Sequence, residues 1–169
     1  MEAKEMITLS LAQAQEYLDM ALDGLTQKEA AWSPGPECNS IAFILWHVAR
    51  VEDFFVNRVI QRLGEVYTVD GWVDKLGTPA KGTGFQYTLE QIQDWPVPKI
   101  EVLEEYADSV RDKTLSFIRD LSPERLSEVP RPEQSQDSIG ETLRHITTEI
   151  GLHIGQIYYL RGIQRGLGK

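Results

Sequence analysis

The sequence of 169 residues contains three histidines and a single cysteine, Cys38. One cysteine cannot form an internal disulfide, so a reducing compartment is expected. No apolar run approaches the roughly 20 residues that a membrane span needs, and the first ten residues, MEAKEMITLS, lack the basic-then-apolar layout of a signal peptide. These absences predict a cytoplasmic protein with no membrane-spanning segment.

Basic residues are also in the minority. The chain has 17 Lys and Arg against 26 Asp and Glu, which gives a net charge of −9, and the acidic residues are spread along the whole sequence. Nucleic-acid phosphates are bound by clustered Lys and Arg. The charge therefore argues against a nucleic-acid partner.

The sequence lacks the signatures of several common enzyme classes. It has no His-Glu-x-x-His, no Gly-x-Ser-x-Gly and no phosphate-binding loop, and Gly82-Thr83-Gly84 is too short for a nucleotide-binding fingerprint. Cys38 has no nearby base that would activate it. No side chain is therefore proposed as a nucleophile.

Helical periodicity, in contrast, is abundant. Apolar residues recur every three or four positions in four segments, at about 3–24, 39–64, 98–121 and 138–162. Asn39-Ser40 and the capping box of Ser138 and Glu141 are typical helix starts. No segment alternates as a strand would, and four amphipathic helices can hide their apolar faces only against one another. The sequence predicts an all-α four-helix bundle forming a single domain over 1–169.

Each segment predicts an apolar stripe. In the first segment the stripe is Met6, Leu9, Ala12 or Gln13, Tyr17, Met20 and Leu25. In the second it is Ile41, Ile44, Leu45, Val48, Val51, Phe55, Val59 and Leu63. The third segment offers Ile100, Leu103, Tyr106, Val110, Leu115 and Ile118. The fourth offers Ile139, Leu143, Ile146, Ile150, Ile154, Ile157 and Leu160.

Two of the connections are long. Residues 64–97 join the second and third segments and contain the large aromatics Trp72, Phe85, Tyr87 and Trp95, which predicts that this connection packs onto the bundle. Thr88 and Gln91 form a capping box for a short helical turn within it. The 122–137 connection begins with Ser122-Pro123-Glu124 and is expected to hold another turn. Long connections favour crossovers over a plain up-down-up-down order.

A candidate metal site emerges on the fourth segment. Glu149 and His153 are spaced i, i+4 and so share one helix face, and Ile150 and Ile157 turn His153 inward. His47 lies at the edge of the stripe of the second segment and could supply a third ligand. Three protein ligands leave coordination positions open, as in catalytic zinc sites. Taken alone, the spacing is more typical of histidines that are hydrogen-bonded core residues.

Two stretches of sequence resemble a known family. Asn39-Ser-Ile-Ala-Phe-Ile-Leu-Trp-His47-Val-Ala-Arg-Val-Glu52 is similar to the second-helix signature of the DinB superfamily, and Glu149-Ile-Gly-Leu-His153-Ile-Gly-Gln156 to its fourth-helix motif. Helix order, length and the long second connection agree along nearly the whole chain. The resemblance implies a four-helix bundle of up-down-down-up topology, commonly a homodimer.

The resemblance also implies a divalent metal held by His47, Glu149 and His153. Many members have three histidines, and this set is similar to the His/Glu/His set of the mycothiol-dependent branch. Zn²⁺ and Ni²⁺ suit these ligands best, although Fe²⁺ and Mn²⁺ also accept them. The activity implied is that of a thiol S-transferase, in which a metal-activated thiol such as bacillithiol or mycothiol attacks a small electrophile.

Five further residues are weighed as neighbours of this site. His145 is an alternative ligand or an outward-facing residue, and Gln156 either hydrogen-bonds a ligand or packs. Arg50 either brings a positive charge to the site mouth or forms a surface salt bridge with Glu52 or Asp53. The connection over 64–97 would cover an apolar substrate with aromatics, among them Trp72 and Trp95.

Two other functions fit the same residues. A metal-dependent hydrolase of small esters or lactones would use a metal-bound hydroxide in place of the thiolate. A non-catalytic metal-binding or dimer-forming protein would use the fold alone. The substrate is expected to be a small molecule in either catalytic case.

Overall fold

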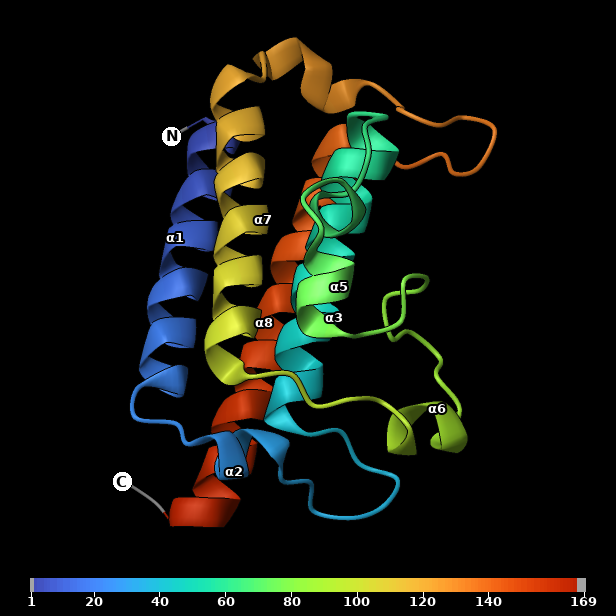
Figure 1. The fold of residues 1–169 in the computed structure, drawn as a ribbon. Coiled ribbons are helices and arrows are strands. Elements are labelled where there is room, and N and C mark those ends of the chain that lie inside the picture. Colours follow the sequence, from blue (N-terminus) through green and yellow to red (C-terminus); the bar gives the residue numbers. More distant parts are fainter. Residues whose placement is uncertain (1, 167–169) are drawn as a thin grey trace.

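The computed structural model describes residues 2–166, and they form an all-helical fold (Figure 1). Within that range there is no strand, as predicted. Four long helices lie side by side: α1 (Ala3–Leu22), α3 (Ile41–Asp53), α7 (Ile100–Asp120) and α8 (Ile139–Arg165). α3 continues directly into a π-helix, η1 (Phe54–Ile60). Among the described residues, no helix is both long and apolar enough to cross a membrane.

Contacts between helix ends define the relative directions of the helices. Lys4 at the start of α1 donates to the Arg119 carbonyl at the end of α7, at 2.6 Å. Arg161 near the end of α8 donates to the Ala21 carbonyl near the end of α1, at 2.5 Å. His47 of α3 and Phe55 of η1 make edge-to-face contacts with His153 and His145 of α8, respectively. α1 and α8 therefore run in one direction, and α3 and α7 run in the other (Figure 1).

Several helices begin at the polar capping residues that the sequence predicts. The Ser40 hydroxyl accepts from the Phe43 N–H at the start of α3. Ser138 and Glu141 form the predicted capping box of α8. The helix α6 (Leu89–Gln93) opens with the predicted capping box of Thr88 and Gln91. These bonds satisfy backbone N–H groups that a helix start otherwise leaves without partners.

The first helix buries a different stripe from the predicted one. Met6, Leu9, Tyr17 and Met20 are between 48% and 63% exposed. The core instead takes Leu11, Ala14, Leu18 and Ala21. Both sets repeat with a helical period, so periodicity alone could not choose between them. The buried set has two alanines, which allow α1 and α8 to pack closely.

The second segment also departs from its predicted stripe. Leu63 is 59% exposed, while Val56 and Ile60 enter the core in place of Val59. The π-helix explains this change: the Gln61 N–H bonds to the Val56 carbonyl, five residues back. The wider π-turn shifts every later side chain around the helix relative to an α-helical period. The fourth segment, which has no such insertion, buries all seven of its predicted positions.

The connections fold into short helices. Between the π-helix and α7 lie α4 (Val66–Val69), α5 (Trp72–Leu76) and α6, and between α7 and α8 lies a 3₁₀ turn, η2 (Pro123–Ser127). The helix α2 (Gln27–Ala31) links α1 to α3. The prediction that the 64–97 connection packs onto the bundle is confirmed, because Tyr67, Trp72, Leu76 and Trp95 are buried in the core.

A buried ion pair joins three of the long helices. Arg111 on α7 makes two bonds of 2.9 Å to the Glu52 carboxylate on α3, and it also donates to the Leu11 carbonyl on α1 at 3.2 Å. Glu52 is 2% exposed and Arg111 is 8% exposed. Removing one partner of such a pair leaves a buried charge uncompensated.

We expect Arg111→Met to lower the free energy of unfolding by about 3–5 kcal/mol, because Glu52 would stay buried without its partner. Urea unfolding followed by circular dichroism measures the change. The matched control is Arg119→Met, which removes an exposed contact of 3.8 Å to Asp120 and should change stability by less than about 0.5 kcal/mol. Equal effects of the two substitutions would show that the buried pair contributes nothing special.

Candidate metal centre

His47, Glu149 and His153 come together where α3 packs against α8. One ligand atom from each residue lies within 4.8 Å of the other two. The centroids of the His47 and His153 rings are 4.9 Å apart, and the rings are arranged edge to face. His153 Nε2 lies 3.4 Å from Glu149 Oε2. The spacing of Glu149 and His153 on one helix face, together with the antiparallel crossing of α3, creates this cluster.

The His47 ring is held by a backbone carbonyl. His47 Nδ1 lies 2.5 Å from the Thr83 carbonyl oxygen, which can only accept a hydrogen bond, so Nδ1 carries the proton. Nε2 is then the unprotonated nitrogen, the form that binds a metal. Burial lowers the pKa of His47, an effect that the Thr83 bond partly offsets. The lowered pKa favours the neutral ring, the form that acts as a metal ligand.

The His153 ring is held in a similar way by a side chain. His153 Nδ1 lies 2.8 Å from Gln156 Oε1, one turn further along α8. With Gln156 Oε1 beside Nδ1, the other ring nitrogen, Nε2, is the one that faces Glu149. Of the two alternatives that the sequence left for Gln156, the structure shows the hydrogen bond to a candidate ligand.

The donor set fits a divalent metal. Two neutral imidazoles and one carboxylate bind Zn²⁺ at about 2.0–2.2 Å, which places neighbouring donors of a tetrahedral ion about 3.4 Å apart. The His153–Glu149 separation is already 3.4 Å. The side chains of His153 and Glu149 are 16% and 31% exposed, so an outside ligand can reach the centre.

The backbone near Thr83 follows the surface of α3 closely. We call residues 82–84 the strap. Gly84 has φ +90°, and a Cβ atom at this position would lie 2.9 Å from Phe43 Cζ and 3.3 Å from His47 Nδ1. Only glycine combines this backbone conformation with so close an approach. The Phe43 ring also stacks on the His47 ring, with 6.4 Å between centroids.

Arg50 is buried rather than at the surface. It is 2% exposed, and its Nη2 lies 2.7 Å from Glu65 Oε2. Its guanidinium also lies 3.9 Å from the centre of the Tyr67 ring. The prediction that Arg50 forms a salt bridge at the surface is therefore wrong. Arg50 does lie 3.6 Å from Asp53, but both side chains are in the interior. Glu52 pairs with Arg111 instead.

Asp53 is a second residue whose role the sequence did not reveal. Its side chain is fully buried and accepts from the N–H groups of Val66 and Tyr67, from Asn57 Nδ2 and from the Tyr106 hydroxyl. Burial raises the pKa of Asp53, and the donated hydrogen bonds act against that rise. A signal was present in the sequence, because three charged residues at 50, 52 and 53 interrupt an otherwise apolar helix.

The remaining site residues that the sequence suggested lie outside the metal triad of His47, Glu149 and His153. His145 is exposed and contacts the edge of Phe55. Trp72 is buried against Tyr106, and Trp95 is buried against Phe43 and Trp46. The two tryptophans thus pack the connection onto the bundle.

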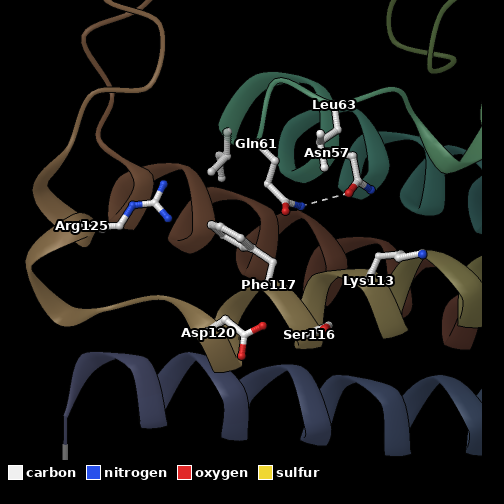
Figure 2. A pocket seen from close by; sticks show the side chains of 9 residues that line it. Asn57, Gln61, Leu63, Lys113, Ser116, Phe117, Asp120 and Arg125 are labelled. Carbon is white, nitrogen blue, oxygen red and sulfur yellow. Dashed lines mark hydrogen bonds between the residues drawn. The ribbon is translucent and has the colours of Figure 1, made fainter.

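A separate hollow of about 430 Å³ lies between the π-helix and α7 (Figure 2). Gln61 donates to Asn57 at its edge, and Lys113, Ser116 and Asp120 project from α7 (Figure 2). No member of the metal triad lines it. This hollow is therefore distinct from the candidate metal centre.

Comparisons with known proteins show the family and the fold of this chain. The family model of the DinB superfamily matches residues 10–157. A solved structure, described as the crystal structure of the conserved protein of locus from Enterococcus faecalis, has a TM-score of 0.86 with this chain. The two share 22% sequence identity over 100% of this chain and 99% of that one, which shows a shared fold. No curated protein matches the sequence significantly.

We expect the protein purified without a histidine tag to hold about one divalent ion per chain. His47→Ala, Glu149→Ala and His153→Ala should each lose most of it, because each removes one of three ligands. Elemental analysis by mass spectrometry measures the metal content. His145→Ala is the matched control and should retain the wild-type content. A wild type and variants with equally little metal would contradict the site.

Proposed function

The chain belongs to the DinB superfamily, and on this basis we propose that it is a metal-dependent thiol S-transferase. It would join a low-molecular-weight thiol to a small electrophile. The observation that carries the proposal is the gathering of three ligand atoms within 4.8 Å at an accessible edge of the bundle. Three protein ligands leave positions at which a further ligand can bind.

The proposed metal is Zn²⁺ or Ni²⁺, held by His47, Glu149 and His153. Two neutral imidazoles and one carboxylate would leave such an ion with net positive charge, which favours the thiolate form of a bound thiol. Bacillithiol and mycothiol are the proposed thiols. The thiolate sulfur would form a bond to the electrophilic carbon, the leaving group would depart with its electron pair, and the thiol proton would go to solvent.

The protein's own groups would orient the reactants. Thr83 and Gln156 hold the Nδ1 atoms of the two histidines, so neither ring has to turn when the metal binds. Phe85 follows the strap directly and is 71% exposed. Its apolar side chain would offer a surface for a small apolar electrophile.

We expect the metal-loaded protein to catalyse thioether formation between one of three thiols and a chloro-dinitroarene. Bacillithiol, mycothiol and glutathione are compared by following product absorbance. Glu149→Gln should reduce the rate by at least about tenfold, because it removes a charged ligand. His145→Ala should retain the wild-type rate.

Two results would contradict a transferase. Turnover of esters or lactones without added thiol would identify a metal-dependent hydrolase. Metal bound at the triad with no turnover of either kind would identify a non-catalytic metal-binding protein.

We also propose that the protein is a homodimer that pairs through the outer faces of α1 and α8. These helices are neighbours, and both expose large apolar side chains: Met6, Leu9, Tyr17 and Met20 on α1, and Leu152, Tyr158, Tyr159 and Ile163 on α8. Eight such residues suit an interface of roughly 800 Å² per partner. A Cβ added at Gly151, Gly155 or Gly162 on α8 would meet no atom within 4 Å, so a second copy can approach the helix closely.

We expect Leu9→Glu and Tyr159→Glu each to shift the protein from dimer to the 19.2 kDa of one chain, because a buried unpaired carboxylate would be costly. Size-exclusion chromatography with light scattering measures the mass. Val69→Glu is the matched control, since Val69 is 69% exposed on α4, away from both helices. A dimer in all three variants would place the interface elsewhere.

A further inference from the structure

We propose that the strap, residues 82–84, fixes the His47 ring for metal binding, and that buried Arg50 is the positioning residue that holds the strap in place. This inference rests on the metal site of the proposed function and assigns its supporting residues. The described polar contacts of Arg50 are with Asp53, Glu65 and Gly82, and none is with a residue of the triad. Arg50 would therefore act through the backbone of the strap.

The first step is the contact between the strap and the ligand. The Thr83 carbonyl fixes both the orientation of the His47 ring and the nitrogen that carries the proton, at 2.5 Å from Nδ1. Without this acceptor, an imidazole is free to turn about its side-chain bonds and to move its proton between the two nitrogens. Part of the ring population would then present the wrong nitrogen to the metal.

The second step is the close packing of the strap on α3. At Gly84, a Cβ atom would lie 2.9 Å from Phe43 Cζ, 3.0 Å from Trp46 Cζ3 and 3.3 Å from His47 Nδ1. Phe43 and Trp46 are buried ring systems that cannot move aside easily. The strap therefore reaches His47 only because position 84 has no side chain and accepts a positive φ.

The third step is the anchor. Arg50 Nη2 donates to the Gly82 carbonyl at 3.2 Å, one residue before Thr83. The same guanidinium binds Glu65 at 2.7 Å and lies over the Tyr67 ring, so both ends of the segment 65–82 are tied to one side chain. Arg50 lies one helical turn after His47 on α3, which brings the anchor and the ligand under the same segment.

The burial of Arg50 supports a positioning role. Its Nε and Nη1 atoms are buried and make no hydrogen bond among the described residues, and Nη1 has only the ion-pair contact of 3.6 Å with Asp53 Oδ2. A buried charge that is not fully satisfied costs stability that an apolar side chain of similar size would not cost. Holding the strap at the metal centre gives a reason for an arginine at this position.

The experiment compares zinc affinity and the His47 tautomer in three variants. Arg50→Met removes the anchor. Gly84→Ala displaces the strap without removing any buried charge. Arg111→Met is the matched control, because Arg111 is also a buried arginine paired with a carboxylate on α3 but makes no contact with the strap. Zinc affinity is measured by competition with a chromophoric chelator at a temperature at which circular dichroism shows every variant folded.

Arg50→Met and Gly84→Ala should each weaken zinc binding by roughly 10–100-fold, the effect expected when a hydrogen bond that orients a ligand is lost. Arg111→Met should stay within about twofold of the wild type. In the metal-free protein, nitrogen NMR of the histidine rings should show His47 as the Nδ1–H form in the wild type and in Arg111→Met, and as a mixture of tautomers in the other two.

An unchanged His47 tautomer in both Arg50→Met and Gly84→Ala would overturn the inference, as would losses of zinc affinity that Arg111→Met shares. The NMR measurement needs neither metal nor substrate. It therefore separates a failure of the strap from a failure of the transferase proposal, which would leave the tautomer result intact.

Discussion

The path of the long connection between η1 and α7 depends on one constraint, which is that charged groups buried within the bundle need partners. The side chain of Asp53 is inaccessible to solvent, and a buried carboxylate has to be met by donors. Four groups from three further elements serve it: Asn57, Val66, Tyr67 and Tyr106. The chain must leave η1 and start α4 in one particular way for these donors to converge. The turn out of the π-helix is thus set by a hydrogen-bond requirement as well as by apolar packing.

After α4 begins, contacts with Arg50 bring the connection back to the metal centre. Arg50 binds Glu65 at the start of α4 and the Gly82 carbonyl near the end of the same segment. The strap then places the Thr83 carbonyl against His47. The helices α3 and α8 by themselves would bring His47, Glu149 and His153 together, but they could not choose the nitrogen that faces the metal. In this protein the connection makes that choice for His47, and Gln156 makes it for His153.

The apolar surface of the protein divides into an inner and an outer part. On α1 the inner part is Leu11, Ala14, Leu18 and Ala21, while larger residues on the same helix face outward. A helical period identifies an apolar stripe but not the neighbour that it faces, because two stripes on one helix can have the same period. The π-helix creates a second ambiguity, since one wider turn moves Val56 and Ile60 into the core and leaves Leu63 outside.

The sequence was enough to predict the all-helical fold class, the starts of α3, α6 and α8, and the buried stripe of α8, because capping and apolar periodicity are local properties of the chain. It also identified the residues of the candidate metal triad, since Glu149 and His153 share a helix face whatever surrounds them. It could not show which face of α1 is buried, that Arg50 and Asp53 lie in the interior, or that a backbone carbonyl from residue 83 holds His47. Those features depend on contacts between residues far apart in the chain. Every residue has a backbone carbonyl group, so no pattern of side chains can predict which carbonyl will contact His47.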